Sequence, residues 1–314
     1  MSLTSLELCA GGGGQALGLE EAGFEHLAVA EIDAGACNTL RANRPGWKVI
    51  EDDIRNLDGH AFEGVYLVAG GVPCQPFSVG GLQLGHADER DLFPEALRII
   101  EEARPKAVML ENVGGLGQRK FSGYRWQVVD RLNELGYTRT WWQGVNAKDY
   151  GVPQLRPRLV LIAMRDPWGL RFTWPWHAYE ATTAGLALWD LMAERGWPGA
   201  EEWARFRCTK VAPTIVGGSK KHGGPDLGPT RARAQWRELG VNGGSIAEEA
   251  PGPDMPVSLM PRLTIRMVAR LQGFPDSWSF QGAKTAAYRQ VGNAFPPPVA
   301  AGLGRAIYRA LEES

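Results

Sequence analysis

One cysteine in a rigid turn is the first feature of this sequence that could do chemistry. Cys74 lies in the proline-bounded segment Gly71–Ser78, directly after the apolar run Val65–Ala69. A thiol held on such a turn, at the end of a strand, is placed to act as a nucleophile. The polar, glycine-rich residues 78–90 predict a loop able to close over a substrate. The other cysteines fit the alternative, a buried place in the core: Cys9, Cys37 and Cys208.

An acid ends a second apolar run. Glu111 follows Ala107–Leu110, and a partly buried carboxyl there would have a raised pKa and could protonate a ring nitrogen. The simpler alternative is an acid that caps the next turn.

Two arginines precede a third apolar run. Arg156 and Arg158 come just before residues 159–164. Side chains at i and i+2 of a strand share one face, so the pair could hold a carbonyl oxygen, a phosphate and the thiolate. Two solvated arginines at a strand edge are the alternative.

A glycine-rich loop, Ala10–Gly14, lies between a predicted strand and a predicted helix. Glycines let the backbone approach a cofactor, and a helix N-terminus offers N–H groups to a carboxylate or phosphate. Glu31 ends the next strand, twenty residues after Gly11, where an acid binds ribose hydroxyls. Asp53-Ile54 could take an adenine amino group and cover its face. A methyl-donor site, a NAD enzyme and a mere tight turn all fit these residues.

The elements that position these residues alternate between strand and helix up to about residue 165. The expected strands are Ser5–Leu8, Leu27–Glu31, Val65–Ala69, Ala107–Leu110, Thr140–Asn146 and Leu159–Met164. The expected helices are Gln15–Ala22, Ala34–Ala42, Pro94–Ala103 and Tyr124–Leu135. This alternation predicts an α/β fold with a parallel, doubly wound sheet. Each motif then lies at the carboxyl end of a strand, where ligands bind in such sheets.

The amino-acid composition changes after residue 165, where tryptophan, proline and glycine become frequent. We expect a catalytic domain of residues 1–170, completed by 283–314, and a smaller recognition domain of irregular or β-rich structure over 171–282. The stretch Gln290–Leu311 regains helical character and is expected to return to the first domain.

Composition is that of an ordinary globular protein, with 44% hydrophobic and 22% charged residues and a net charge of −1. Any nucleic-acid or membrane partner must therefore be met by a local patch. The four cysteines form no CxxC pair, which predicts neither a zinc site nor a disulfide framework. The sequence has no signal-peptide pattern and no apolar run of membrane length, so we expect a cytoplasmic protein.

Taken together, the motifs make the chain similar to the DNA (cytosine-5) methyltransferases over nearly its whole length. Ala10–Gly14 resembles the family's S-adenosylmethionine loop, Pro73-Cys74-Gln75 its nucleophile motif and Glu111-Asn112-Val113 its acid motif. Gln154–Arg158 resembles its Gln-x-Arg-x-Arg motif, Arg262–Asp276 the element that organises the recognition domain, and Gln290–Ala294 the last motif, which packs against the cofactor. The resemblance implies a Rossmann-like class I methyltransferase sheet with a target-recognition domain.

The resemblance also implies the reaction, methyl transfer from S-adenosyl-L-methionine to carbon 5 of cytosine in a short, specific duplex DNA sequence. Cys74 would add to carbon 6 while Glu111 supports protonation at N3, so that carbon 5 takes the methyl group. Arg158 would bind the base carbonyl and orient Glu111, with Arg156 near a phosphate or the thiol. The target base must be flipped out of the duplex, because carbons 5 and 6 are stacked inside it.

Binding residues follow from the same resemblance. Those expected at the cofactor are Cys9, Ala10, Gly11, Gly12, Gly14, Glu31, Ile32, Asp53, Ile54 and Asn293. Those expected at duplex DNA, where phosphates need cations, are Gln75, Ser78, Arg90, Lys220, Lys221, Arg231 and Arg233. In two places the chain departs from the family pattern: Cys9 stands where the family often has phenylalanine, and Met267 where many members carry glutamate, which questions a local ion pair.

Three other functions remain as alternatives. Cytosine-5 methylation of tRNA is one, because Cys208-Thr209 echoes an extra Cys-Phe-Thr signature of one branch of the fold. A catalytically silent DNA-binding subunit is disfavoured by the joint presence of Cys74, Glu111, Arg156 and Arg158, and a NAD dehydrogenase leaves Cys74 unused. We expect a monomer without a metal, releasing S-adenosyl-L-homocysteine at the nucleoid, alone or beside a separately encoded cognate restriction endonuclease.

Overall fold

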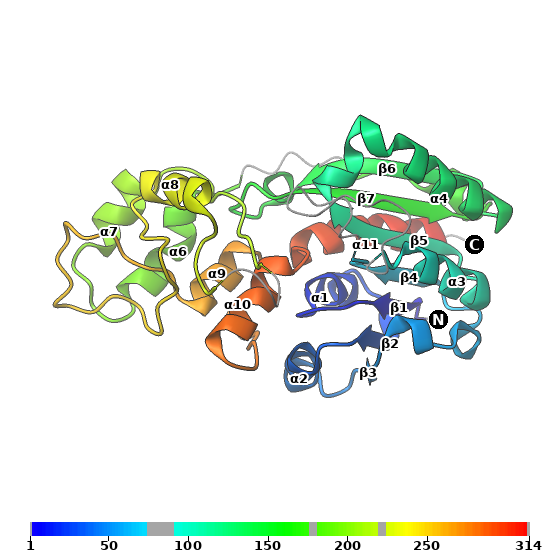
Figure 1. Ribbon diagram of the computed structural model, residues 1–314, viewed down its shortest axis with the longest axis horizontal. Coiled ribbons are helices and arrows are strands. Elements are labelled where there is room, and N and C mark those ends of the chain that lie inside the picture. Colours follow the sequence, from blue (N-terminus) through cyan, green and yellow to red (C-terminus); the bar gives the residue numbers. More distant parts are fainter. Residues whose placement is uncertain (1, 74–90, 176–180, 219–223, 313–314) are drawn as a thin grey trace. The chain divides into compact units, whose positions relative to one another are not determined.

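The computed structural model describes residues 2–73, 91–175, 181–218 and 224–312 of the 314-residue chain (Figure 1). The chain divides into two compact units. Unit 1 comprises Met1–Val145, Pro157–Trp176 and Val299–Ser314, and unit 2 comprises Asn146–Arg156 and His177–Pro298. No helix among the described residues is long and apolar enough to cross a membrane.

Unit 1 is built on a seven-stranded sheet with the order β3-β2-β1-β4-β5-β7-β6. Its strands are β1 Thr4–Leu8, β2 Glu25–Glu31, β3 Val49–Glu51, β4 Leu67–Gly70, β5 Ala107–Val113, β6 Arg139–Asn146 and β7 Pro157–Met164. From β1 the chain first builds outward to β2 and β3, and then resumes on the other side of β1 with β4. The order therefore reverses between β1 and β4, the place where open α/β sheets bind ligands.

All six predicted strands form, with ends that differ from the expected ones by up to three residues. The prediction of a wholly parallel sheet was wrong, because β7 pairs antiparallel with β5. The segment between β6 and β7, residues 147–156, holds only a short 3-10 turn. A return to a parallel strand needs a crossover of a dozen or more residues, usually a helix, and this connection has none.

Five helices of unit 1 cover the sheet: α1 Gly14–Glu21, α2 Ala34–Asn43, α3 Phe93–Ala103, α4 Ser122–Glu134 and α11 Pro297–Glu312. A short helix, α5 Trp168–Arg171, follows β7. Helices α3 and α4 cover the sheet (Figure 1), and their Ile99 and Leu132 belong to the same buried apolar cluster as Leu8 and Leu110 of the strands. Full burial of each such side chain stabilises the fold by about 1.5–3 kcal/mol.

The C-terminal helix α11 belongs to unit 1 from Val299 onward and packs beside α1, whereas the sequence analysis expected all of Gln290–Leu311 there. Gly304 allows the close approach, since a Cβ there would lie 2.8 Å from the Cβ of Ala22. Tyr308 makes an edge-to-face contact with Phe24, at 5.3 Å between ring centroids.

Unit 2 is helical and irregular. Its helices are α6 Ala184–Ala193, α7 Ala200–Glu202, the π-helical turn Trp203–Arg207, α8 Thr230–Glu238, α9 Ile265–Leu271 and α10 Lys284–Asn293. Apart from Asn146, the last residue of β6, its described residues form only isolated bridges, Gln154↔Ala212 and Ala247↔Thr264. Of the two structures expected here, irregular was right and β-rich was wrong. The core instead gathers large aromatic side chains, Trp203 and Trp236, which bury much area without a strand ladder.

Residues 283–298, which the sequence analysis placed with the catalytic part, pack inside unit 2. Helix α10 contacts α9, and its Gly292 lies so close to Gly217 that a Cβ on Gly292 would be 2.4 Å from the Gly217 Cα. Glycine is required at this crossing of two backbones.

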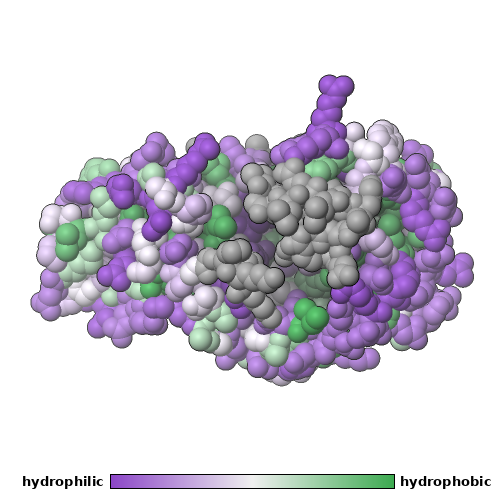
Figure 2. All heavy atoms as spheres, viewed as in Figure 1, coloured by the Kyte–Doolittle hydropathy of each residue, from purple (hydrophilic) through white to green (hydrophobic). Residues whose placement is uncertain are grey.

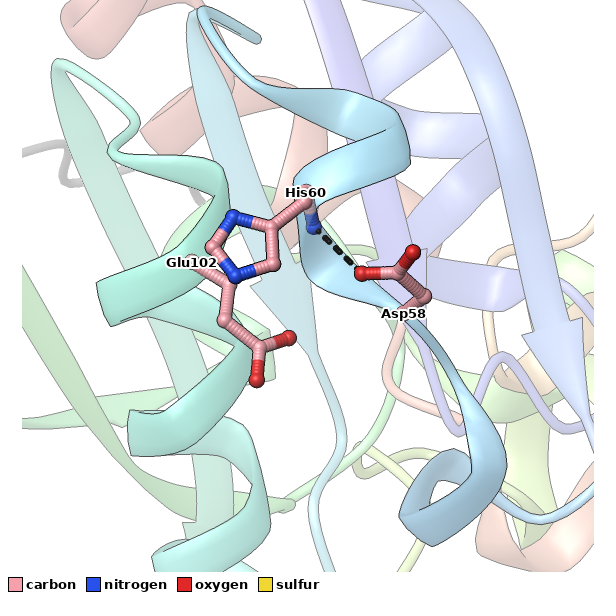
Figure 3. Close-up of side chains that lie close together, drawn as sticks. All are labelled: Asp58, His60 and Glu102. Carbon is pink, nitrogen blue, oxygen red and sulfur yellow. Dashed lines mark hydrogen bonds between the residues drawn. The ribbon is translucent and has the colours of Figure 1, made fainter.

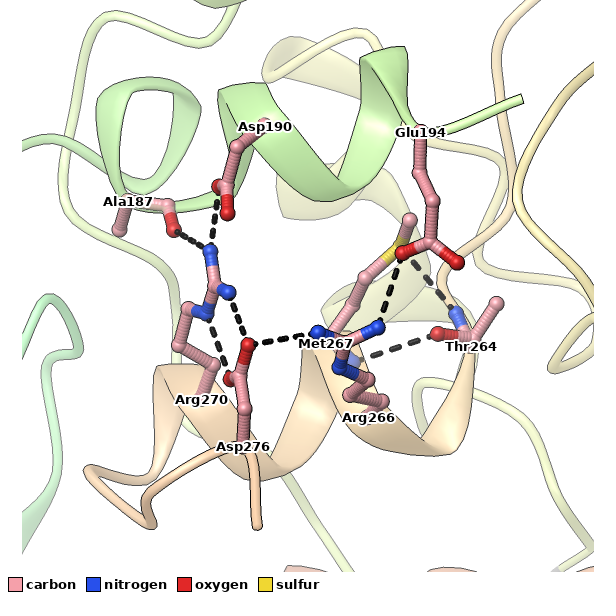
Figure 4. Close-up of polar contacts among 8 residues, drawn as sticks. All are labelled: Ala187, Asp190, Glu194, Thr264, Arg266, Met267, Arg270 and Asp276. Carbon is pink, nitrogen blue, oxygen red and sulfur yellow. Dashed lines mark hydrogen bonds and ion pairs between the residues drawn. The ribbon is translucent and has the colours of Figure 1, made fainter.

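An ion-pair network joins α9 to α6 (Figure 4). Arg266 contacts Glu194 and Asp276, each at 2.9 Å, and Arg270 pairs with both Asp190 and Asp276. Met267, where the family often has glutamate, instead closes the helix start, with its Sδ accepting from the Thr264 N–H at 3.4 Å. The local ion pair that a glutamate at position 267 would offer is therefore replaced by the pairs of Arg266 with Glu194 and Asp276.

Candidate active site

The loop after β1 turns sharply into α1 at the point where the strand order reverses. Its residues Cys9, Gly11 and Gly13 have φ of 53°, 54° and 89°, the left-handed region that favours glycine. The Gly13 N–H donates to the Ala10 carbonyl at 3.0 Å. A Cβ at Gly11 would meet nothing within 4 Å, so the space over the loop is open.

Glu31, at the end of β2, holds this loop. Its two carboxylate oxygens accept from the N–H of Gly11 at 2.7 Å and of Asp33 at 2.8 Å. The side chain is buried, and burial raises its pKa although the two backbone donors act in the opposite direction. Burial, with the nearby charges of Glu31 and Asp53, likewise raises the pKa of the Cys9 thiol, which makes it a poor nucleophile.

The remaining expected cofactor residues of unit 1 lie at the ends of β2 and β3. Ile32 is a large apolar side chain with 65% of its surface exposed. The Asp53 carboxylate accepts from the Arg55 N–H at 2.9 Å and pairs with the Arg55 guanidinium at 2.8 Å, while Ile54 is buried beside it. Unit 1 therefore presents the glycine loop, Glu31, Ile32 and Asp53 at the carboxyl ends of three adjacent strands.

Asn293, also expected at the cofactor, lies in unit 2. Its side-chain amide donates to the Gly218 carbonyl at 3.2 Å.

Glu111 and Arg158 form an ion pair in unit 1, on the neighbouring strands β5 and β7. Arg158 Nε lies 2.7 Å from Glu111 Oε1, and each side chain is 12% exposed. The turn after β4 runs against the same carboxylate, because a Cβ at Gly71 would lie 3.4 Å from Glu111 Oε2. Such a carboxyl, largely shielded from water and held by an arginine, can position a proton.

The turn after β4 is fixed to β5 by Asn112, whose buried amide donates to the Val72 carbonyl at 3.0 Å. The Pro73 carbonyl accepts from the Leu92 N–H at 3.2 Å. Asp91 in turn accepts from the Tyr124 hydroxyl at 2.6 Å. Four expected site residues, Cys74, Gln75, Ser78 and Arg90, lie outside the described residues.

Arg156 does not share a strand face with Arg158, so that prediction was wrong. Strand β7 begins at Pro157, and Arg156 belongs to unit 2. Its buried guanidinium donates to the carbonyls of Ile215 at 2.8 Å, Gly292 at 2.8 Å and Ala294 at 2.9 Å. In the described contacts it joins two backbone segments of unit 2, while its expected role near a phosphate or the thiol stays a prediction.

Gln154, two residues earlier, connects the segment at Ile215 to the end of helix α9. Its buried amide donates to the Leu271 carbonyl at 3.0 Å and to Gln272 Oε1 at 2.7 Å, and it accepts from the Ile215 N–H at 3.0 Å. The Gln-x-Arg part of this motif is therefore a hydrogen-bonded centre of unit 2.

Sequence reasoning missed two residues of unit 1. Gly70 lies in the β1–β4 pairing, where a Cβ would be 2.5 Å from the Leu8 carbonyl oxygen; the Gly70-Gly71 doublet was the available signal. Glu7, in the middle of β1, is fully buried, and neither carboxylate oxygen has a hydrogen-bond partner among the described residues. Burial raises its pKa well above the ordinary value; a charged residue between Leu6 and Leu8 was the signal.

Two expected DNA-binding residues are described, both on α8 of unit 2. Arg231 is exposed and Arg233 is half-buried. Lys220 and Lys221 lie outside the described residues.

Asp58, His60 and Glu102 are the group of side chains in the described part whose spacing could suit a metal, with their ligand atoms within 4.8 Å of one another (Figure 3). Both carboxylates accept hydrogen bonds from the backbone. Asp58 accepts from the His60 N–H at 3.0 Å, and Glu102 accepts from the Gly59 N–H at 2.8 Å. Arg98 also contacts Glu102 at 2.8 Å. The carboxylates of Asp58 and Glu102 thus already accept hydrogen bonds from within the chain.

Comparison with known proteins identifies relatives over the full length. The family model described as C-5 cytosine-specific DNA methylase matches residues 3–309. The Type II methyltransferase M.NaeI of Lentzea aerocolonigenes is 52% identical over 99% of this chain and 76% of its own length. The Type II methyltransferase M.NgoMIV of Neisseria gonorrhoeae is 49% identical over 100% of this chain and 99% of its own.

Solved structures share the fold. A putative DNA modification methyltransferase encoded within an E. coli prophage superposes with a TM-score of 0.70 at 24% identity, covering 99% of this chain and 100% of its own. A mutant of DNMT2 from Spodoptera frugiperda gives 0.67 at 19% identity, over 98% and 100%. The Rossmann-like methyltransferase fold that the sequence predicted is confirmed.

Proposed function

The chain belongs to the C-5 cytosine-specific DNA methylase family. We propose from this that its active site lies at the carboxyl ends of β1, β4 and β5, and that a methyl group is transferred there to carbon 5 of cytosine in duplex DNA. The protein is a DNA cytosine-5 methyltransferase similar to Type II restriction–modification enzymes. The observation that carries the proposed site is the Glu111–Arg158 ion pair, which lies beside the turn that leads toward Cys74.

The tRNA alternative is not favoured. Its one sequence signal, Cys208, is fully buried, and burial raises the pKa of its thiol to about 12. A thiol in that state is neither accessible nor ionised at neutral pH.

The residues at the ends of β1, β2 and β3 suit S-adenosyl-L-methionine. The open space over Gly11 leaves room for a ligand against the backbone. The exposed apolar Ile32 offers a surface to a purine ring, and the oxygens of Glu31 lie beside it for ribose hydroxyls. Bound there, the cofactor would supply an electrophilic methyl group on sulfonium and leave as S-adenosyl-L-homocysteine. Asn293 is proposed to contact it as well.

The chain's own residues would make the cytosine ring reactive. The Cys74 thiolate forms a bond to carbon 6, and the ring electrons move toward N3, where Glu111 supports protonation. Carbon 5 then gains the methyl group, loses its proton to a base, and the bond to sulfur breaks. Arg158 holds the Glu111 carboxyl in place and would donate to the base carbonyl.

We assign catalysis to the first domain and DNA recognition to the second, with residues 171–282 supplying the sequence-specific contacts. In this proposal Gln75, Ser78, Arg90, Lys220, Lys221, Arg231 and Arg233 contact the DNA. The enzyme would act as a monomer at the bacterial nucleoid, and a cognate restriction endonuclease is its expected partner in the cell.

Trapping of a covalent intermediate tests the reaction. A duplex oligonucleotide with 5-fluorocytosine at the target position cannot lose a proton from carbon 5, so the enzyme should remain attached. We expect an adduct that survives denaturing electrophoresis, that needs S-adenosyl-L-methionine, and that is absent with Cys74→Ser.

The target position is found first by bisulfite sequencing of plasmid DNA from cells that express the protein, with Cys74→Ser as the control. Methylated duplex without any trapped adduct would overturn the proposed mechanism. Methyl transfer to tRNA but not to duplex DNA would overturn the substrate.

A further inference from the structure

Unit 2 contains a concavity of about 750 Å³ beside helix α8. Thr230, Arg233 and Arg237 of α8 line one side of it, and Asn242 and Arg262 contribute from other segments. None of these side chains has a part in the proposed chemistry.

The spacing along α8 puts the lining residues on one stripe. Positions 230, 233 and 237 are i, i+3 and i+7, which share a helix face, and the two arginines are about 6 Å apart along the axis. Trp236 is fully buried, and it fixes the rotation of α8 with this stripe toward the concavity.

The arginines of this stripe are not neutralised, in contrast to those of α9. Arg266 and Arg270 are each held by two acids (Figure 4). Among the described residues, Arg233 and Arg237 have no acidic partner within ion-pair distance. Glu249, the acid that lines the concavity, pairs with Arg195. The concavity therefore carries a positive charge that calls for an acceptor from outside the chain.

Arg233 is held in a defined position before any ligand arrives. Its stem packs over Gly243, where a Cβ would lie 3.2 Å from Arg233 Cγ. Its Nε is buried and has no hydrogen-bond partner among the described residues. The packed stem restricts the rotamers of Arg233, so less side-chain entropy is lost when its guanidinium binds a ligand.

The same concavity exposes apolar side chains, Leu259 at 58% and Met260 at 39% of their surfaces. Hydrophobic and hydrophilic residues are mixed on the face of unit 2 seen in Figure 2. Phosphates need only cations and N–H groups, whereas base edges in the major groove present both acceptors and apolar carbon. The mixture therefore favours base edges over the phosphate backbone.

We infer that the α8 stripe, Arg233 and Arg237, contacts guanine O6 and N7 in the major groove at base pairs outside the target pair, and so determines the methylated sequence. Arginine is the side chain that pairs bidentately with guanine. This inference rests on the proposed function and assigns its sequence specificity to named residues.

The test compares Arg237→Ala and Arg237→Lys with the parent on a series of duplexes. The parent's methylated sequence is read from plasmid DNA, and each base pair of it is then replaced in turn. For Arg237→Ala we expect discrimination at one G·C position to fall about 10- to 100-fold in kcat/KM. Arg237→Lys keeps the charge but cannot form the bidentate pair, so it should not restore discrimination. Arg233→Lys should relax a different position.

Gln235→Ala is the matched control, since Gln235 is exposed on α8 and lies off the stripe. Its discrimination profile should equal the parent's, and circular dichroism of every variant checks the fold. Equal loss on all duplexes with Arg237→Ala, restored by Arg237→Lys, would mean a phosphate contact and would overturn the inference. A parent enzyme that methylates no duplex would show instead that the proposed function fails.

Discussion

Arg158 Nε lies 2.7 Å from Glu111 Oε1 across the neighbouring strands β5 and β7. The two residues are separated by a helix and a strand in sequence, and the antiparallel insertion of β7 beside β5 brings them together. With each side chain 12% exposed, the pair is partly shielded from water, so its geometry is more restrained than that of a surface ion pair.

Removing either partner should impair catalysis through the same carboxyl. For Glu111→Gln we expect single-turnover methyl transfer to slow about 100- to 10,000-fold, the usual contribution of a general acid. Arg158→Ala should slow it in the same direction, because the carboxyl loses its orientation. Because Arg158 would also bind the base carbonyl, the double variant should be slower than Glu111→Gln alone, but by less than the product of the two single losses. Losses that multiply in the double variant would mean that the two residues act independently.

Adjacent glycines should respond differently to alanine. At Gly70 the new Cβ would lie 2.5 Å from the Leu8 carbonyl oxygen, and the backbone cannot move without breaking the Leu8–Gly70 pairing. Gly70→Ala should therefore lower the free energy of unfolding by about 1–3 kcal/mol, measured by urea denaturation.

At Gly71 the nearest atom is Glu111 Oε2, at 3.4 Å, an ordinary contact. Gly71→Ala should keep the parent's stability and slow methyl transfer, because a methyl group then lies against the carboxylate. Equal stability losses in the two variants would contradict this assignment.

Arg156 should matter more for stability than Arg158. Arg156→Ala leaves three buried carbonyls without their donor, and each unsatisfied group costs about 1–3 kcal/mol. We expect a loss of about 3 kcal/mol or more in unfolding free energy. Arg158→Ala leaves one carboxylate, 12% exposed, without its partner, and should cost less, about 1–3 kcal/mol. Urea denaturation measures both losses. If Arg158→Ala proved the more destabilising variant, the structural role assigned to Arg156 would be wrong.

Glu7 should make the protein less stable as the pH rises. Burial raises its pKa in the folded state, so between the ordinary pKa of glutamate and the raised one the folded chain holds a proton that the unfolded chain has lost. Stability then falls with rising pH across that window and is greatest below it.

Glu7→Gln has no such proton. Its free energy of unfolding should therefore rise relative to that of the parent from pH 5 upward, which means that the variant becomes the more stable of the two. Chemical denaturation at several pH values measures the difference. A difference that does not change with pH would show that Glu7 is ionised in the fold.

Much of unit 1 could be predicted from sequence because its signals are local. An apolar run followed by glycine or a polar residue predicts a strand and its end, and the six expected strands all form. Parallel neighbours place their carboxyl ends at one edge whatever their order. The glycine loop, Glu31 and the Cys74 turn could therefore be assigned to one site before any contact was known.

The sequence alone thus determined the element types, the family and the edge of the sheet that carries the chemistry. Tertiary structure decided which side chains meet. Arg158 lies within β7 and pairs with Glu111, whereas Arg156 lies just before the strand and binds the carbonyls of Ile215 and Gly292. Only long-range packing shows that unit 2 builds its core from tryptophans and short helices. Local patterns record a residue's preferred backbone, whereas its partners depend on contacts between segments more than fifty residues apart, which no local pattern encodes.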